Sequence, residues 1–345
     1  MTDVPASRFP LPASRSPNPT RMPSFQHLLL KQFLTAAAAP LARRKPSVGA
    51  IRLAMEAGSL FQFMPWKVNL ESFRLDSRLE AEWLRPRTAH PTRVLLYLHG
   101  GGYVLGSLNT HRSLVGSLAQ RTGLNVLTIN YRKAPDHPFP AALDDARRAY
   151  RWLLRQGHQS HDIVVGGDSA GGGLALALLL ALRDAGEALP AAGIGLSPWT
   201  DLNLPTAALR RVAREESLLL EALQMRTWGP LYAHKTALSH PLLSPAQADL
   251  HGLPPLLIQI STAEVLYDDV LKFAAKARAA GVPVVVQPFE GLVHWWHLFW
   301  RVVPEARQAL DQVAEFLVDT WAAQVAPPVR LPVVPRRTAA RRRAA

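Results

Sequence analysis

The chain has 345 residues, 48% of them hydrophobic, which suffices for one large α/β core or for a core with a small inserted cap. It has no cysteine, so disulfides, thiolate chemistry and cysteine-ligated zinc are excluded. The net charge of +13 lies almost wholly at the two ends: residues 1–45 have seven basic and one acidic side chain, and residues 325–345 have six basic and no acidic ones. We therefore predict a nearly neutral folded part and no nucleic-acid partner.

No run of about 18 or more apolar residues occurs, so we expect no transmembrane helix and no stable membrane insertion. The mildly apolar stretch 33–42 comes before its basic residues, Arg43 to Lys45, which is the reverse of a signal peptide. We predict a cytoplasmic protein on this ground. The prediction is the same whether translation starts at Met1 or at Met22.

The composition of both chain ends predicts disorder. In the segment after the N-terminal end, the spacing of apolar residues predicts helices. Residues 1–22 are rich in Pro, Ser and Arg, and residues 325–345 combine Pro, Ala and Arg without a core pattern. Between residues 23 and 65, apolar side chains such as Leu29 and Phe33 recur at helical spacing. We expect two amphipathic helices there. Because these helices precede the first strand, we assign them to a cap.

From residue 66 to residue 324, short apolar runs alternate with helical segments. This alternation predicts a largely parallel sheet with helices on both faces. It is interrupted at about residues 201–245, where helical patterns without a strand predict the second part of the cap. The expected strands are 68–75, 79–84, 93–98, 125–131, 161–165, 192–196, 255–260 and 283–289, and the expected helices are 141–156, 171–184, 206–220, 223–232 and 306–322.

The sequence Gly-Asp-Ser-Ala-Gly at 167–171 fits the G-x-S-x-G pattern of a nucleophile elbow. It lies between a predicted buried strand and a helix rich in Ala and Leu. A sharp strand-to-helix turn needs residues without bulk beside the nucleophile, and the helix N-terminus favours developing negative charge. The alternative is an ordinary glycine-rich turn. The position between strand and helix favours Ser169 as a nucleophile.

A second glycine-rich segment, the sequence His-Gly-Gly-Gly at 99–102, follows the strand predicted at 93–98. Three glycines allow the backbone to approach a substrate and to turn its N–H groups toward it. Acyl transfer passes through a tetrahedral oxyanion, which such N–H groups stabilise. A simple strand-to-loop turn is the alternative. The place of the segment, about seventy residues before the elbow, predicts an oxyanion hole made by Gly101, Gly102 and Ala170.

In this order of elements, the acid and then the histidine of a triad should follow the nucleophile. His294 lies on the loop after the last predicted strand, where it can reach the serine, whereas His297 is expected inside the next helix. Three carboxylates compete for the third place. Glu264 is nearest the end of the preceding strand, whereas Asp268 and Asp269 are expected to begin a helix, where capping is their alternative role. We prefer Glu264 and keep Asp268 as the alternative.

Together these motifs resemble those of the bacterial hormone-sensitive-lipase-like esterases, a family of the α/β-hydrolase fold. The similarity extends from about residue 68 to residue 321. It is carried by HGGGY at 99–103, YRKAPDHPFPAALDD at 131–145, GGDSAGGG at 166–173, SPWTDL at 197–202, AEVLYDD at 263–269 and GLVHWW at 291–296.

The resemblance implies an α/β-hydrolase core of eight strands with an N-terminal pair of cap helices. It implies a serine carboxylesterase that hydrolyses short- to medium-chain esters through an acyl-enzyme, with no cofactor and no metal. A small-molecule ester is the expected partner, and the resemblance also allows a homodimer. The family usually has Asp-Pro-Leu where this chain has Glu264-Val265-Leu266, and Lys133 replaces a leucine of the family motif. The acid that aligns with the family is therefore a glutamate.

Three rival functions fit parts of the pattern. A non-catalytic binder of small molecules on the same fold would lack the histidine, which is present here. A hydrolase of lactones, amides or acetyl esters would use the same triad, because the pockets that select a substrate follow no readable code. A peptidase of this fold would carry a further large domain, and no internal repeat is seen. An apolar pocket is expected from Phe61, Phe63, Trp66, Trp199, Trp228 and Trp295.

Overall fold

The computed structural model of this protein describes residues 22–203 and 225–325. Its centre is a sheet of eight strands in the order β1-β2-β4-β3-β5-β6-β7-β8. Strand β2 is antiparallel to both of its neighbours, β1 and β4, whereas all other neighbouring pairs are parallel. The predicted sheet of eight mostly parallel strands is therefore confirmed. The strands are β1 (Val68–Arg74), β2 (Glu80–Pro86), β3 (Val94–Leu98), β4 (Asn125–Ile129), β5 (Ile163–Asp168), β6 (Ala192–Leu196), β7 (Leu256–Ser261) and β8 (Val284–Phe289).

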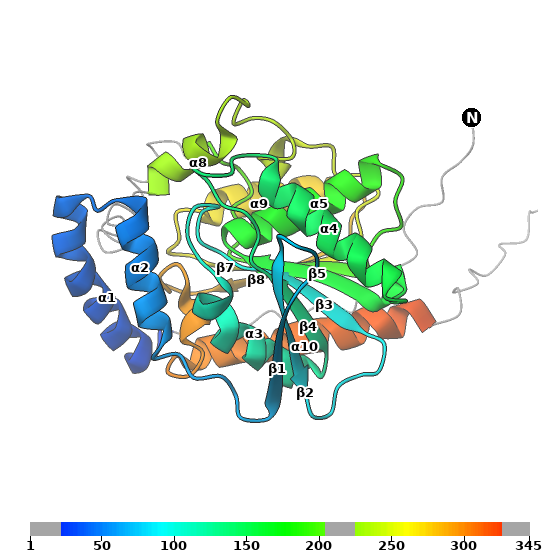
Figure 1. The fold of residues 1–345 in the computed structure, drawn as a ribbon, viewed down its shortest axis with the longest axis horizontal. Coiled ribbons are helices and arrows are strands. Elements are labelled where there is room, and N and C mark those ends of the chain that lie inside the picture. The colour runs from blue at the N-terminus through cyan, green and yellow to red at the C-terminus, as the bar shows by residue number, and fades with distance from the viewer. Residues whose placement is uncertain (1–21, 204–224, 326–345) are drawn as a thin grey trace, which may run out of the picture.

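Helices cover both faces of the sheet, as Figure 1 shows. Helices α3 (Leu108–Thr122) and α10 (Pro304–Val325) lie against one face and contact each other. Helices α4 (Ala141–Arg155), α5 (Ala170–Asp184) and α9 (Tyr267–Ala279) lie against the other face. This arrangement confirms the three-layer architecture that the alternation of strands and helices predicts.

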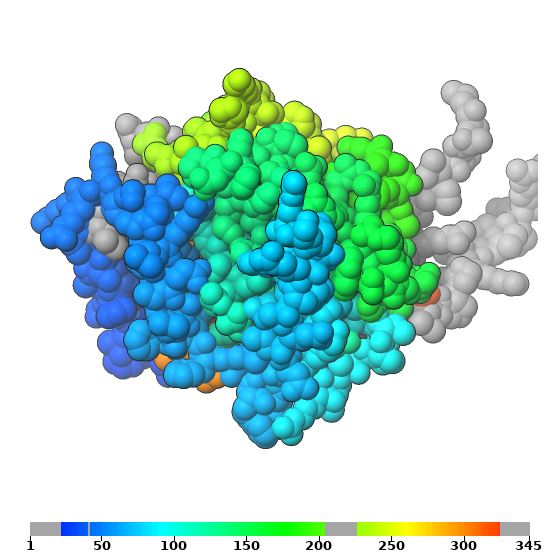
Figure 2. All heavy atoms as spheres, viewed as in Figure 1, coloured from blue at the N-terminus to red at the C-terminus, as the bar shows by residue number. Residues whose placement is uncertain are grey.

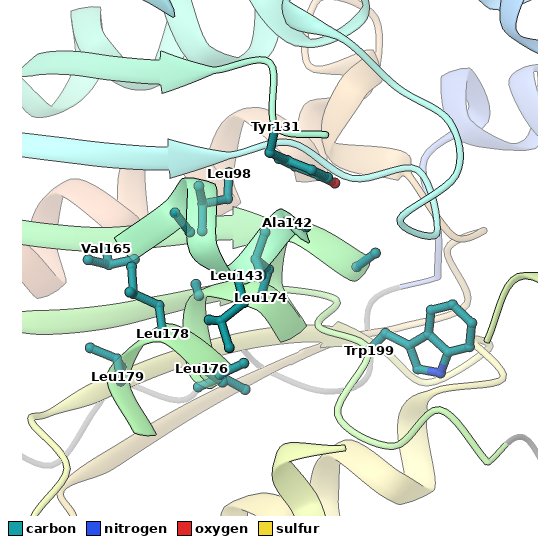
Figure 3. Close-up of a cluster of buried hydrophobic side chains, with 14 of the residues drawn as sticks. Leu98, Tyr131, Ala142, Leu143, Val165, Leu174, Leu176, Leu178, Leu179 and Trp199 are labelled. Carbon is teal, nitrogen blue, oxygen red and sulfur yellow. The ribbon is translucent and has the colours of Figure 1, made fainter. Parts of the chain in front are cut away.

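A hydrophobic core fills the space between the sheet and each helical layer. Figure 3 shows part of the core on the α5 side, where Val165 of β5 lies near Leu174 and Leu178 of α5. The core on the other face includes Leu114 of α3 and Leu310 of α10. All five side chains are buried, and each contributes roughly 1.5–3 kcal/mol to folding by leaving water. The two cores hold the sheet rigid beneath the loops at its edge.

Parallel pairing brings the ends of the central strands to one edge of the sheet. Leu98 at the end of β3 pairs with Gly167 near the end of β5, and Ser261 at the end of β7 pairs with Phe289 at the end of β8. The glycine-rich loop, the elbow and the loops with the predicted acid and base follow these four strands. They therefore meet at the carboxyl edge of the sheet, where open α/β sheets bind their ligands.

The largest difference from the predicted strands lies just before the elbow. Residues 160–162 form a short 3-10 helix, not the start of a strand, and β5 continues to Asp168. Gly166 and Gly167 thus belong to the strand, where they pair with Ile194 and Gly195 of β6. Glycine has a low strand propensity, but pairing with β3 on one side and β6 on the other fixes the backbone here.

Helices α1 (Phe25–Arg44) and α2 (Val48–Ser59) precede the sheet and lie at one end of the molecule, in the blue region of Figures 1 and 2. Only part of the predicted apolar stripe of α1 packs against the protein. Leu34 packs against a buried cluster, whereas Phe33 is 70% exposed and Leu29 is 50% exposed. His27 and Ala38 are buried instead. The periodicity thus predicts the helix correctly, but only part of the side that packs against the protein.

In the second predicted part of the cap, the helix expected at 206–220 lies outside the described residues. The helix expected at 223–232 corresponds to α8 (Met225–Ala233), which is drawn above the other helices in Figure 1. Trp228 and Tyr232 of α8 are buried. Tyr232 stacks on Tyr103 with ring centroids 3.9 Å apart, which fixes α8 against the loop that follows β3.

Candidate active site

Ser169 lies in the sharp turn between β5 and α5. Its backbone has φ 50° and ψ −120°, a conformation that L-residues rarely adopt and that is typical of strained functional turns. Hydrogen bonds fix this conformation: the Ser169 N–H donates to Leu196 O at 2.9 Å, and the Trp199 N–H donates to Ser169 O at 2.9 Å. A Cβ added at Gly171 would overlap the carbonyl of Leu98, so the turn requires glycine there.

The structure brings Ser169, His294 and Glu264 into one chain of contacts. His294 Nε2 lies 2.8 Å from Ser169 Oγ, and His294 Nδ1 lies 2.5 Å from Glu264 Oε2. All three side chains are at least 96% buried. With Nδ1–H donating to the carboxylate, Nε2 is free to accept the hydroxyl proton of Ser169. This is the geometry of a nucleophile, a general base and an acid that orients the base.

The second carboxylate oxygen of Glu264 is also bonded. Glu264 Oε1 accepts hydrogen bonds from Ser197 Oγ at 2.7 Å and from the Ser261 N–H at 3.0 Å. Burial disfavours the charged carboxylate, but His294 and these two hydrogen bonds hold the pKa of Glu264 below its usual value. Glu264 is therefore ionised at neutral pH and can stabilise a cationic imidazole.

The two residues kept as alternatives or decoys lie elsewhere. Asp268 is in the first turn of α9, whose N-cap is Leu266 and has no side-chain capping bond. In this turn the Asp268 carboxylate lies at the positive end of the helix dipole. His297 lies in a short 3-10 helix, with Nε2 3.1 Å from Gln259 Oε1, and burial lowers its pKa to about 3. It is a neutral side chain packed in the core beside the site.

The glycine-rich loop after β3 has positive φ angles that residues other than glycine rarely adopt. Gly101 has φ 117° and Gly102 has φ 64°. A Cβ added at Gly102 would overlap the indole of Trp228, which packs directly on this loop from α8. Among the described residues, no atom accepts a hydrogen bond from the N–H groups of Gly101 or Gly102. Ala170 is the first residue of α5, where helical N–H groups also have no helical acceptor.

A buried polar network supports the glycine-rich loop from below. Asp168 Oδ1 accepts from the Gly100 N–H at 3.0 Å and from Tyr97 Oη at 2.8 Å, and its Oδ2 lies 3.2 Å from His111 Nε2. Burial opposes ionisation of Asp168, but His111 and the hydrogen bonds lower its pKa to about 2. An anion fixed between the nucleophile and Gly100 thus ties the elbow to the loop with the predicted oxyanion donors.

The shape of this loop also depends on stacking. The ring of His99 stacks on Tyr131 at a centroid distance of 4.2 Å, and Tyr131 Oη donates to His99 O at 2.7 Å. Burial lowers the pKa of His99 well below its usual value, so the imidazole is neutral. Arg132, next to Tyr131, donates two hydrogen bonds to the two carboxylate oxygens of Asp145. The segment at 131–145 thus supports the glycine-rich loop by packing and hydrogen bonding.

The cavity beside Ser169 is small, at about 10 Å³, which is room for roughly one water molecule. Trp295 and Leu298 form part of its wall. The other aromatic residues expected in a pocket do not surround this cavity. Phe61, Phe63 and Trp66 are exposed by 80, 67 and 76%, and Trp199 is fully buried in the hydrophobic core. None of these four side chains lines the cavity beside Ser169.

Some residues around the site were missed by the sequence analysis. Ser197 appears in the sequence only as part of a family motif, and nothing in the motif indicates that it binds Glu264. Asp168 is next to the nucleophile in the sequence, and this position could have indicated a role at the site. Nothing in the sequence around His111 indicates such a role. In the described ranges, no three His, Asp or Glu side chains are grouped to hold a metal ion. None of the helices in those ranges is long and apolar enough to cross a membrane.

Comparison with known proteins identifies the family. The family described as "alpha/beta hydrolase fold" matches residues 95–298, which is more than half of the chain. The chain belongs to the α/β-hydrolase family.

Relatives of this α/β-hydrolase agree with the geometry of the site. An "Acetyl-hydrolase" of Streptomyces hygroscopicus is 47% identical over 238 residues, which are 69% of this chain and 79% of the relative. The crystal structure of EstE5, soaked in p-nitrophenyl butyrate, superimposes with a TM-score of 0.80 at 37% identity, covering 87% of this chain and 99% of EstE5. A solved esterase from the bacterial hormone-sensitive lipase family has a TM-score of 0.74 at 36% identity, covering 82% of this chain and 97% of that esterase. The resemblance to that esterase group is confirmed.

Proposed function

We propose that this α/β-hydrolase is a serine carboxylesterase that hydrolyses short- to medium-chain esters through an acyl-enzyme. The observation that carries the proposal is the continuous contact from Ser169 through His294 to Glu264, with distances of 2.8 and 2.5 Å. The N–H groups of Gly101 and Gly102, which have no acceptor among the described residues, support it as the oxyanion site. The names of the relatives, an acetyl-hydrolase and esterases, agree with it.

The reaction proceeds in two acyl transfers. His294 Nε2 takes the Ser169 proton while Ser169 Oγ attacks the ester carbonyl carbon, whose oxygen becomes the oxyanion. The N–H groups of Gly101, Gly102 and Ala170 bind this oxyanion. When the tetrahedral intermediate collapses, the bond to the alcohol breaks and His294 gives its proton to the leaving oxygen. Water then repeats the sequence on the acyl-enzyme, with His294 as the base, and releases the acid and Ser169.

We propose a short acyl group for the substrate. Trp228 packs against the oxyanion loop at Gly102, and the relative that is 47% identical is named an acetyl-hydrolase. Both observations favour an acetyl or similarly short group over long acyl chains. Hydrolysis of acetyl esters is therefore the second candidate function, and it differs from the first only in the substrate. A non-catalytic binder has no use for a base held between a serine and a carboxylate.

Four further features belong to the proposal. Residues 23–65 and about 201–245 form the cap over the site, which the packing of Trp228 on Gly102 supports. The disordered ends at 1–22 and 325–345 and the cytoplasmic location stay predictions from the sequence. A homodimer also stays a prediction, and size-exclusion chromatography with light scattering tests it.

Hydrolysis of p-nitrophenyl esters from acetate to palmitate tests the proposed activity. The wild type is compared with Ser169→Ala, and unfolding curves show whether both proteins are folded. We expect the wild type to cleave acetate and butyrate fastest, and Ser169→Ala to lose nearly all of this activity.

Each of the three possible results decides part of the proposal. An active wild type and an inactive, folded mutant support the esterase, and the chain-length profile then measures the acyl pocket. A folded wild type that cleaves no chain length contradicts the proposed activity on simple esters. Equal activity of both proteins would exclude Ser169 as the nucleophile.

A further inference from the structure

The loop that presents His294 is held by side chains from two different parts of the chain. We call residues 290–294, which follow β8 and end with His294, the base loop. Three consecutive N–H groups of this loop each donate to a side chain. Gly291 N donates to Thr262 Oγ1 at 3.0 Å, Leu292 N to Ser261 Oγ at 2.8 Å, and Val293 N to His27 Nε2 at 3.1 Å. The first two acceptors lie at the end of β7, but the third comes from α1.

His27 is built as an acceptor at this position. Its side chain is fully buried, and Nε2 faces the Val293 N–H, so the proton of the neutral ring is on Nδ1. Nδ1 itself has no hydrogen-bond partner among the described residues. The ring of His27 is thus held by one hydrogen bond among the described residues. Here the bonded group is the backbone of the residue before His294.

Other residues at the start of α1 fix His27 against the base loop. Ser24 donates from its N–H at 2.6 Å and from its hydroxyl at 2.8 Å to the two carboxylate oxygens of Glu305, which lies in the first turn of α10. Pro23 packs on Gly291, where an added Cβ would lie 2.9 Å from the proline ring. The first turn of α1 thus bridges α10 and the base loop.

The middle of α1 adds apolar contacts with the same loop. Ala38 and Val293 are both buried and form one cluster, with Leu34 and Trp295 packed against it. Leu30 packs against the cluster that contains Leu292. The outer side of the same helix carries exposed residues such as Gln32. The base loop is therefore enclosed between the end of β7 on one side and the inner side of α1 on the other.

We propose that His27 is a positioning residue for His294: from α1, it binds the Val293 N–H and fixes the base loop that places the imidazole between Ser169 and Glu264. This inference rests on the proposed esterase function. It assigns to α1 a part in the catalytic geometry, in addition to a place in the cap. A shift of the loop by about 1 Å would lengthen both contacts of His294, and such misplacement can cost about 100-fold in rate.

Two substitutions of His27 separate the hydrogen bond from packing. His27→Leu keeps an apolar volume but removes the acceptor, whereas the Oε1 of His27→Gln can still accept from Val293 N. Gln32→Ala, on the exposed side of the same helix, is the matched control. Each variant is assayed for kcat and KM on p-nitrophenyl acetate. Each is also examined by proton NMR for the low-field signal expected from the His294 Nδ1–H bonded to Glu264.

We expect His27→Leu to lower kcat about 10- to 100-fold with a smaller change in KM, and to lose or shift the low-field signal. His27→Gln should stay within about three-fold of the wild type and keep the signal, because its hydrogen bond is retained. Gln32→Ala should match the wild type. A folded His27→Leu with wild-type kcat and an unchanged signal would overturn the proposal. So would equal losses in the Leu and Gln variants with the signal intact in both.

Glu305→Gln keeps the proposal testable if His27→Leu does not fold. This variant weakens the contact with Ser24 and leaves His27 in place. We expect a reduction of kcat by a few-fold and a shifted low-field signal, and no change in either would contradict the proposal. The NMR signal requires no substrate. It therefore decides the role of His27 even if the wild type hydrolyses none of the esters, which is the result that would refute the proposed function instead.

Discussion

Replacing Glu264 by glutamine tests how the carboxylate controls His294. The present carboxylate accepts three hydrogen bonds: Oε2 from His294, and Oε1 from Ser197 Oγ and the Ser261 N–H. An amide has only one oxygen. The Ser261 N–H can only donate, so the amide oxygen must take the place of Oε1. The amide NH2 is then directed at His294 Nδ1.

This arrangement forces the wrong tautomer of His294. Because the amide donates to Nδ1, the ring proton moves to Nε2, which faces Ser169 Oγ and can no longer accept its proton. Turning the amide around would place NH2 against the Ser261 N–H and leave a buried donor unpaired, at a cost of about 1–3 kcal/mol. In other Ser-His-Asp hydrolases the wrong tautomer lowers kcat by about 10⁴. We expect a similar loss here, equivalent to about 5.5 kcal/mol in the barrier.

The assay is kcat on p-nitrophenyl acetate for Glu264→Gln, Glu264→Asp and Asp268→Asn, with unfolding curves for each. Aspartate keeps the charge but is one methylene shorter, so its loss should fall between those of the wild type and Glu264→Gln. Asp268→Asn should stay within about three-fold, since it retains the side-chain volume away from His294. A loss below ten-fold in Glu264→Gln, or a larger loss in Asp268→Asn, would refute the tautomer argument and point to Asp268 as the acid.

Three other predictions concern the surroundings of the triad. Ser197→Ala removes one hydrogen bond to the charged Glu264, so kcat should fall by about ten-fold, and an unchanged kcat would show that the Ser261 N–H is sufficient. Gly102→Ala introduces a Cβ at φ 64° against Trp228; we expect a loss of at least about 1 kcal/mol in urea unfolding and of about 100-fold in kcat, and retention of both would contradict the close packing. Burial lowers the pKa of His27 from 6.5 to about 4, against attraction from Glu305, so its contribution to stability is complete above pH 6.5 and is lost as the pH falls toward 4. Unfolding at pH 7 and pH 5 should therefore differ less in His27→Gln than in the wild type, and an equal difference would mean that His27 is not the group that titrates.

Short-range patterns in the sequence determined most of the fold and the identity of the predicted triad. The elbow at Ser169 and the glycine-rich loop are each coded by a few adjacent residues placed after an apolar strand. Since parallel strands end at one edge of a sheet, the order of elements also predicts that the acid and His294 arrive at that edge. The position of Glu264 nearest the strand end favours it over Asp268, and the structure places Glu264 beside His294.

Only the tertiary structure decided which distant side chains support these residues. Ser197 binds Glu264 across 67 residues and His27 binds Val293 across 266 residues, and no spacing in the sequence relates such partners. The side of α1 that is buried was likewise decided by tertiary contacts. Phe33 and Leu29 would face inward if burial followed hydrophobicity alone, yet the base loop needs an acceptor for its Val293 N–H, and His27 supplies it. The hydrogen bond from Val293 N to His27 and the packing of Ala38 on Val293 orient α1, and both contacts join segments far apart in the sequence.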